Sequence, residues 1–225
     1  GRPKFELAGI QMVSKVELHE KMKLRCLNGT HSALAYLGYL AGYNTIAECV
    51  SNDSMVNYIQ YLWKKEIIPT LETPEDEDLN DYCSELLERY ENPAIEHRTW
   101  QIAMDGSQKL PQRILETVSD LIKHKRGFQG LALAIAAWIK YVTGIDLNGE
   151  VIDVRDPLAK DLAIIAKKSK TIEHYVDSIL DLNKVFPANL RNSSTFRMEI
   201  QKSFKFLDQY GSLVSIKKLM SAAEK

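Results

Sequence analysis

The chain has 225 residues, with 29 Lys and Arg against 30 Asp and Glu and a net charge of −1. This balance gives no reason to expect a nucleic acid or an anionic membrane as a partner. No apolar run reaches the length of a bilayer span, and no signal peptide opens the chain. Cys26, Cys49 and Cys83 form no CxxC pair, so we expect free thiols and a cytoplasmic protein.

The first predicted element is a long helix from about Glu17 to Ala41, after an extended lead-in over residues 1–15. Leucines recur in it at three- and four-residue spacings, and Gly42 follows as a stop signal. Gly29 and Gly38 inside this helix each cost about 1 kcal/mol relative to alanine. Close approach of a neighbouring helix or of a substrate would account for both glycines.

Capping residues, glycines and prolines divide the rest of the chain into further helices. A turn is predicted at Asp105-Gly106-Ser107, just before the helix that Pro111 opens. The predicted start signals of these helices are Asn52 and its neighbours, Thr73-Pro74, Thr171 and Ser194. The predicted ranges are 45–50, 53–67, 74–90, 111–125, 129–142, 157–167, 171–182, 194–210 and 212–222.

Residues 129–142 are apolar almost all round and are predicted to form the buried central helix. Strands are expected in one place only, a short hairpin over residues 145–155 that turns at Asn148-Gly149. The sequence therefore predicts a mainly α-helical, single multi-helix domain over residues 1–225, with at most a short β-hairpin.

No metal site is expected. The carboxylates of residues 72–81 lack the glycine and the spacing of a calcium loop, and we interpret them as a solvated face. The five histidines form no HExxH pair, and no cysteine has a ligand at zinc spacing.

The candidate chemistry lies on the first helix. At about 100° per residue, Asn28 lies roughly 140° and His31 roughly 80° from Lys23, so the three share a broad face beside the apolar stripe. A partly desolvated lysine exchanges protons near neutral pH, and an amide can stabilise a developing alkoxide. The alternative is a surface lysine paired with Glu20, a helix irregularity beside Gly29 and a packed histidine. Spacing alone does not decide between them.

Two long motifs, residues 23–43 and residues 97–113, resemble the mannitol dehydrogenase family, the long-chain polyol and hexuronate dehydrogenases. The resemblance extends over nearly the whole chain and implies the C-terminal domain of a two-domain dehydrogenase. It implies that Lys23 is the general acid and base, acting without a metal. It further implies that Asn28 is one of two asparagines that stabilise the oxyanion, and that His31 orients the substrate.

The second motif bears on the substrate. The resemblance implies that Lys109 contacts the substrate. Without the resemblance, a surface lysine near a helix N-terminus is the simpler interpretation. Gln101 stands where some mannitol-specific members carry a substrate-contacting arginine. Arg98 and Arg113 lie nearby in sequence and, with Lys109, would receive a carboxylate in the two-pronged geometry of a guanidinium. The second motif most resembles that of the family members that reduce fructuronate, and together with the Gln101 departure this resemblance implies reduction of D-fructuronate to D-mannonate, with the fructose and mannitol pair as the alternative.

A nicotinamide enzyme needs a nucleotide site, yet the sequence has no GxGxxG motif after a strand. We expect NAD to be bound mainly by an N-terminal nucleotide-binding domain outside this chain, and the chain alone to be inactive. That domain and a small sugar acid or polyol are the expected partners. The alternative from another class is a non-catalytic helical interaction domain.

Overall fold

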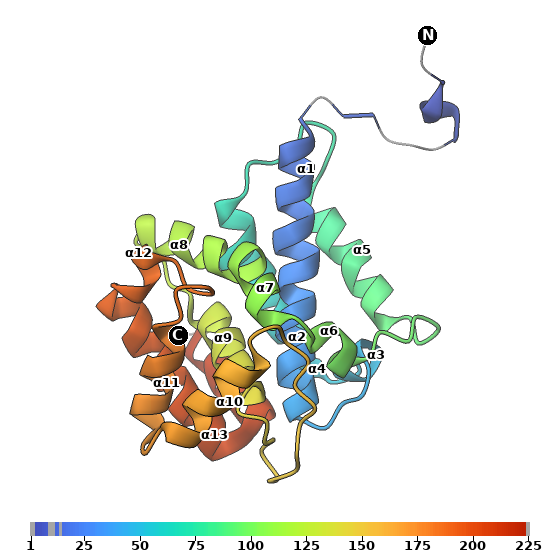
Figure 1. The fold of residues 1–225 in the computed structure, drawn as a ribbon. Coiled ribbons are helices and arrows are strands. Elements are labelled where there is room, and N and C mark those ends of the chain that lie inside the picture. The colour runs from blue at the N-terminus through green and yellow to red at the C-terminus, as the bar shows by residue number, and fades with distance from the viewer. Residues whose placement is uncertain (1–2, 9–11, 14, 224–225) are drawn as a thin grey trace.

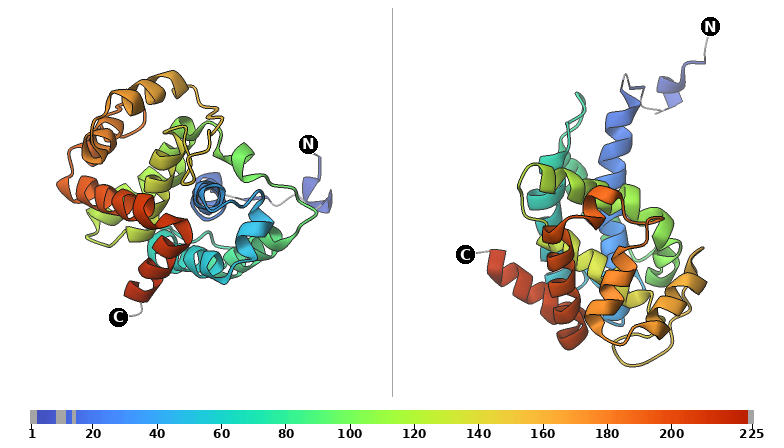
Figure 2. Two further views of the ribbon diagram at one scale, coloured as in Figure 1. Left: turned by 90° about the horizontal axis from the view of Figure 1, so that it is seen from below. Right: turned by 60° about the vertical axis from the view of Figure 1, so that its left-hand side comes forward.

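The computed structural model describes residues 3–8, 12–13 and 15–223. One continuous helix runs through the middle of the molecule and is formed by α1 (Val16–Met22), η2 (Lys23–Gly29) and α2 (Thr30–Leu40) (Figure 1). Seen along its axis, it is surrounded by the other helices (Figure 2). The helix predicted from 17 to 41 is confirmed. In the predicted extended lead-in, Phe5–Ala8 is instead a 3-10 turn (η1), and residues 1–2, 9–11 and 14 lie outside the described residues.

The remaining elements are also helical, with η marking 3-10 and π segments. In chain order they are α3 (Ile46–Val50), α4 (Asp53–Tyr61), η3 (Leu62–Ile67), η4 (Ile68–Thr70), α5 (Leu79–Glu91), α6 (Thr99–Ala103), α7 (Gly106–Leu110), η5 (Pro111–Leu115), α8 (Glu116–Lys123), α9 (Gln129–Tyr141), α10 (Ala159–Lys168), α11 (Ile172–Leu180), α12 (Ala188–Arg191) and α13 (Ser194–Ala223). The mainly α-helical class is confirmed.

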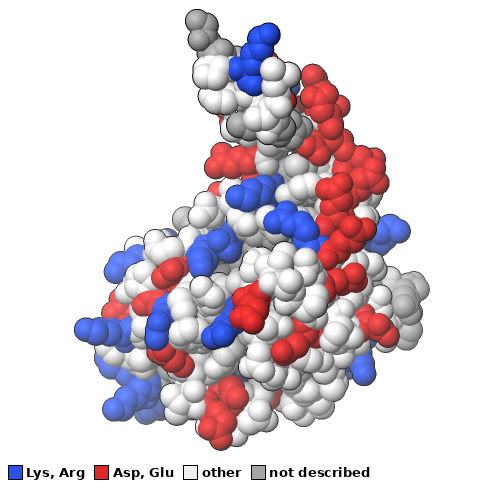
Figure 3. Space-filling model, turned by 90° about the vertical axis from the view of Figure 1, so that its right-hand side faces the viewer, with Lys and Arg blue, Asp and Glu red and all other residues white. Residues whose placement is uncertain are grey.

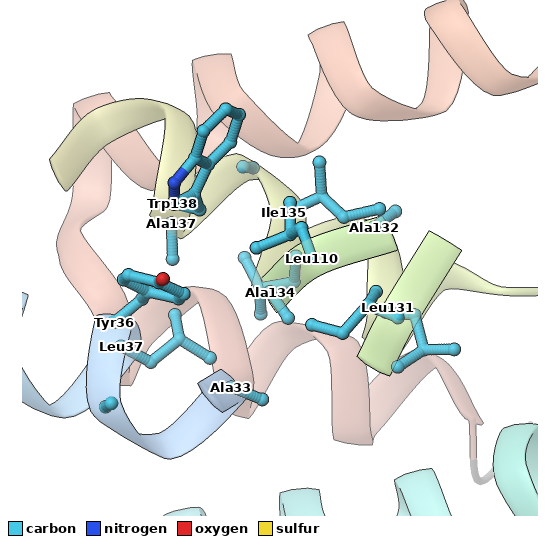
Figure 4. Close-up of a cluster of buried hydrophobic side chains, with 14 of the residues drawn as sticks. Ala33, Tyr36, Leu37, Leu110, Leu131, Ala132, Ala134, Ile135, Ala137 and Trp138 are labelled. Atoms are coloured by element: carbon cyan, nitrogen blue, oxygen red, sulfur yellow. The ribbon is translucent and has the colours of Figure 1, made fainter. Parts of the chain in front are cut away.

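The core is built around α9, whose residues are buried on every side, as its apolar sequence predicts. Tyr36 and Leu37 of α2 lie against Ala137 and Trp138 of α9 (Figure 4). The long helix α13 packs on α9 and changes direction at Gly211, where φ is +78°. Glycine adopts this backbone conformation without strain, so the predicted break at Gly211 is confirmed.

A buried carboxylate caps the start of α9. Glu66 is 1% exposed, and its two oxygens accept hydrogen bonds of 2.8 Å from the backbone N–H groups of Gly130 and Leu131. These bonds satisfy two of the free N–H groups at the helix N-terminus. Burial nevertheless dominates and raises the pKa of Glu66 to about 7.

Two helix starts follow the predicted caps. The side chains of Asn52 and Thr171 each accept a backbone N–H bond at the start of α4 and α11. Thr45, predicted as the first residue of its helix, caps α3 in the same way. The predicted start of α5 at Thr73-Pro74 is wrong. The helix begins at Leu79 because the carboxylate of Asp78 accepts the N–H groups of Asn80 and Asp81, at 2.7 and 3.1 Å.

Two further starts differ from the prediction. Ser193 rather than Ser194 caps α13, since its hydroxyl accepts the N–H of Phe196 at 3.2 Å. The helix expected to open at Pro111 begins earlier, at Gly106, so that Pro111 falls inside a continuous run through Lys123. Proline clashes with the carbonyl four residues before it in an α-helix, and the wider π turn of η5 relieves this crowding.

The predicted hairpin is reduced to a single antiparallel bridge between Ile145 and Val151. Asp146 holds the turn, because its carboxylate accepts the N–H groups of Asn148 and Glu150 at 2.7 and 2.9 Å. The intervening Gly149 has a φ of +87°. Nowhere in the described ranges does the backbone form a named strand.

The acidic stretch before α5 is a surface loop, with Glu72, Glu75 and Asp76 exposed. Acidic side chains gather along one edge of the projecting part of the molecule (Figure 3). Among the residues that the structure describes, no three acidic, histidine or cysteine side chains are grouped to hold a metal. No described helix combines the length and apolarity that crossing a membrane requires.

Candidate active site

Two of the candidate residues, Lys23 and Asn28, lie on a π segment, which the sequence did not predict. In η2, from Lys23 to Gly29, backbone bonds join residues five apart instead of four. Residues five apart therefore stack one above the other, as residues four apart do in an α-helix. Lys23 and Asn28 have this spacing and share one face, so the predicted separation of roughly 140° is wrong. π turns occur frequently at functional sites.

Side chains from two other helices and from Thr30 donate hydrogen bonds to the carbonyl groups of this π turn. The Cys26 carbonyl accepts bonds from Trp63 Nε1 at 2.9 Å and from Thr30 Oγ1 at 2.6 Å. Tyr90 Oη donates to the Leu27 carbonyl at 2.9 Å. Because a buried carbonyl needs a donor, these contacts stabilise the irregular turn.

Gly29 allows a second helix to cross at the same level. A Cβ atom on Gly29 would lie 2.8 Å from the carbonyl oxygen of Arg113 in η5. Gly38 is needed similarly, because its Cβ would lie 2.2 Å from the sulfur of Cys49. Close helix packing therefore accounts for both glycines. At Gly29 it also brings the second motif to the first.

Two of the polar residues of the π turn are open to a partner. Lys23 is exposed, and within the described part of the chain it forms no ion pair, with Glu20 or any other carboxylate. The expected partial desolvation of Lys23 is therefore wrong for this chain by itself. Asn28 is half-buried, and the described residues supply no hydrogen-bond partner for its amide.

His31 sits one turn further along, in a socket of aromatic and basic groups. Its ring stacks on Tyr90, with centroids 5.4 Å apart, and lies 5.0 Å from the ring of His97. Burial, followed by the charges of His97, Arg113, Lys109 and others, lowers the pKa of His31 to about 3, so the ring is neutral at pH 7. Its Nε2 atom is buried without a hydrogen-bond partner in the described structure. A ligand hydroxyl or carbonyl would supply the missing bond.

Two basic residues of the second motif lie beside His31. Arg113 donates from Nη1 to Ser32 Oγ at 3.1 Å, while its Nε is buried without a partner among the described residues. Lys109 donates to the Ile102 carbonyl at 3.3 Å. Burial lowers the pKa of both groups, and the charge of Arg113 lowers that of Lys109 further. The charges of both residues lower the pKa of His31, and the Arg113 bond to Ser32 places its guanidinium next to the residue that follows His31.

The loop before Lys109 is built to present it. Asp105 adopts a left-handed conformation with φ of 56°, and its carbonyl accepts the N–H groups of Gln108 and Lys109 at 3.0 Å each. Ser107 is fully buried and bonds to the Asp156 carboxylate through its N–H, at 2.8 Å, and its hydroxyl, at 2.5 Å. The predicted turn at 105–107 therefore opens α7 and is anchored to a distant segment.

Two other predicted residues lie apart from this cluster. Arg98 is exposed, pairs with Glu96 at 3.9 Å and lines a surface hollow of about 860 Å³ with Thr45 and Glu48. That hollow contains neither His31, Lys109 nor Arg113. Gln101 is exposed on α6. The expected three-residue basic cluster is thus reduced to Lys109 and Arg113.

Sequence reasoning missed His97 and Tyr90, both of which contact the His31 ring. His97 carried a signal, because it opens the second motif. Tyr90 carried none beyond its place on an amphipathic helix, since only the packing of α5 against η2 brings it to the site.

The chain matches one protein family and is similar in sequence to dehydrogenases of known name. The family described as "Mannitol dehydrogenase C-terminal domain" matches residues 15–208. D-mannonate oxidoreductase of Escherichia coli is 42% identical over 212 residues, which are 94% of this chain and 43% of that protein. A mannitol 2-dehydrogenase of Emericella nidulans is 34% identical over 221 residues, covering 97% of this chain and 43% of the relative.

A solved structure has the same fold. Mannitol 2-dehydrogenase of Pseudomonas fluorescens, in a ternary complex with NAD and D-mannitol, superposes with a TM-score of 0.92 at 30% identity. The match covers 98% of this chain and 44% of that one. The chain therefore spans a little under half the length of the relatives it matches.

Proposed function

Because this chain belongs to the mannitol dehydrogenase family, whose C-terminal domain it matches, we propose that it is the substrate-binding and catalytic domain of an NAD-dependent oxidoreductase. The proposed reaction is reduction of D-fructuronate to D-mannonate. Residues 1–225 would form this one domain, and a nucleotide-binding domain outside the chain would hold most of NAD. The NAD complex of the Pseudomonas fluorescens structure supports this choice of cofactor.

The observation that carries the proposal is the His31 socket. It places a neutral imidazole with an unpartnered Nε2 beside a guanidinium with an unpartnered Nε, next to the turn of Lys23 and Asn28. Buried polar atoms without partners are rare in folded proteins, and here they occur on His31 and on Arg113, which bonds to Ser32, the next residue after His31. A polar ligand with a hydroxyl and an anionic group would satisfy both.

When bound, the nicotinamide supplies a hydride to the keto carbon of the substrate. Lys23 would donate a proton to the ketone oxygen, so that C=O, hydride and proton together become CH–OH. The Asn28 amide would donate a hydrogen bond to the oxygen as negative charge develops on it. His31 Nε2 would hold a substrate hydroxyl and so orient the carbonyl. Because Lys23 is exposed in this chain, its desolvation would have to come from the substrate and the nucleotide-binding domain.

Two observations support a sugar acid over a polyol. Arg113 offers its unpartnered Nε to a carboxylate, which a guanidinium binds more strongly than it binds a hydroxyl. Gln101 also stands where some mannitol-specific members carry an arginine. Fructose and mannitol remain the second candidate pair, which the Emericella nidulans and Pseudomonas fluorescens relatives favour.

The test is NADH oxidation by the full-length parent protein, offered D-fructuronate and D-fructose separately. Lys23→Ala should abolish turnover while keeping cofactor binding; a non-catalytic interaction domain would lose little. Arg113→Ala should raise KM for fructuronate by about 10- to 100-fold, the loss of one charged hydrogen-bonded contact. Arg98→Ala removes the same charge outside the socket and serves as the matched control. Turnover of fructose alone, or equal effects of both arginine variants, would refute the carboxylate assignment.

A further inference from the structure

Three rings are stacked beside the π turn that carries Lys23 and Asn28. The Trp63 and Tyr90 rings lie 6.4 Å apart at an interplanar angle of 19°. The Tyr90 and His31 rings follow at 5.4 Å and 18°. Trp63 comes from η3, Tyr90 from α5 and His31 from α2, so the stack ties three separate helices together.

The polar ends of two of these rings bond to the backbone of the turn itself. Trp63 Nε1 donates to the Cys26 carbonyl, and Tyr90 Oη donates to the Leu27 carbonyl, both at 2.9 Å. The Tyr90 hydroxyl also lies 3.0 Å from Thr30 Oγ1. In an α-helix, N–H groups four residues later would satisfy these carbonyls. Here Thr30 of the helix itself reaches both carbonyls, since its N–H bonds to the Leu27 carbonyl and its hydroxyl bonds to the Cys26 carbonyl at 2.6 Å, and the two rings add a further donor to each.

The contacts have a geometric consequence for the site. A π turn is rare because its own hydrogen bonds do not favour it over an α turn, so it persists where the surroundings stabilise it. Without the Tyr90 hydroxyl the buried Leu27 carbonyl loses a donor, which makes the π turn less stable relative to an α turn. Lys23 and Asn28 would then no longer stack on one face.

We propose that Tyr90, assisted by Trp63, is a positioning residue that holds the π turn and thereby aligns Lys23 with Asn28 and His31. Its hydroxyl fixes the backbone register, and its ring supports the His31 imidazole. This role rests on the proposed function, because it concerns the same three residues. It predicts that losing the hydroxyl impairs the chemical step more than substrate binding.

The experiment compares two tyrosines in the full-length parent protein. Tyr90→Phe removes the hydroxyl and keeps the stacked ring, while Tyr175→Phe removes a similar buried bond, from Tyr175 Oη to the Ile139 carbonyl at 2.8 Å, far from the π turn. With NADH and fructuronate, Tyr90→Phe should lower kcat by about 10- to 100-fold, as misplacement of reacting groups does. Its KM should change by less than about threefold. Trp63→Phe should act in the same direction, and Tyr175→Phe should leave kcat unchanged.

Hydrogen–deuterium exchange over residues 23–31 supplies a readout that needs no substrate. Exchange there should rise in Tyr90→Phe and Trp63→Phe but not in Tyr175→Phe. Unchanged exchange overturns the proposal that Tyr90 holds the π turn, whatever the activity of the variant. Raised exchange with full kcat, or an equal kcat loss in Tyr175→Phe, overturns the positioning role. A wild-type parent that reduces neither fructuronate nor fructose refutes the proposed function instead, while the exchange data still decide whether Tyr90 holds the turn.

Discussion

Replacing Glu66 by glutamine should remove a pH-dependent part of the stability. The folded-state pKa of Glu66 is about 7, because burial disfavours its charge, against a reference value of 4.5. The folded state therefore binds this proton more tightly than the unfolded state does. The contribution of Glu66 to stability is complete below pH 4.5 and is lost as pH rises through 7. Between pH 5 and 8 the two pKa values correspond to a loss of about 2.5 kcal/mol.

Urea unfolding of the 225-residue chain at pH 5 and pH 8 measures this difference. At pH 5 wild-type Glu66 is protonated, but its hydroxyl oxygen can still accept a bond, whereas the amide NH2 of Glu66→Gln cannot. The variant should therefore destabilise the fold by about 1–3 kcal/mol at pH 5. The free energy of unfolding of the variant minus that of wild type should be about 2.5 kcal/mol more positive at pH 8 than at pH 5, because only wild type loses stability over this range. Glu85→Gln, which removes an exposed carboxylate from α5, controls for charge alone. A pH-independent difference between Glu66→Gln and wild type would refute the assigned pKa.

Three further outcomes are expected. Gly29→Ala should destabilise the chain by about 1–3 kcal/mol, because the new Cβ would lie 2.8 Å from the Arg113 carbonyl oxygen. The same clash should lower kcat of the full-length parent protein. Urea unfolding measures the first effect and steady-state kinetics the second. The ring NMR signals of His31 should titrate with a midpoint near pH 3. Because this pKa lies below the unfolded value of 6.5, the contribution of His31 to stability should be complete above pH 6.5 and be lost as pH falls towards 3. A midpoint near 6.5 would contradict the buried socket. Ser107→Ala should cost about 1–2 kcal/mol by leaving the Asp156 carboxylate short of a donor, and should raise KM, whereas an unchanged KM would separate this anchor from the site.

Local chemistry in the sequence determined most of the secondary structure. Asn52 and Thr171 cap helices where predicted, because a side-chain oxygen can reach the N–H two or three residues later without help from the fold. The same rule failed at Thr73-Pro74, where Asp78 offered a better acceptor closer to the apolar residues of α5. The buried helix 129–142 followed from its composition alone.

The site was predicted as a set of residues but not as a geometry. Resemblance pointed to Lys23, Asn28 and His31, whereas their relation on the helix was wrong because an α-helical spacing was assumed. The spacing is that of a π turn, which the sequence of η2 does not reveal. Donors from Trp63 and Tyr90, remote in sequence, stabilise it.

By itself, then, the sequence determined most of the helices, some of their caps and the apolar composition of the central helix, because these depend on residues a few positions apart. Only the tertiary structure decided that Arg113 bonds to Ser32 beside His31 while Arg98 lines a separate surface hollow. Both arginines belong to one motif of 17 residues, 97–113, but the loop at Asp105 and the crossing at Gly29 turn one toward the site and leave the other outside it. Such contacts depend on how helices pack, and packing joins residues that no local pattern connects.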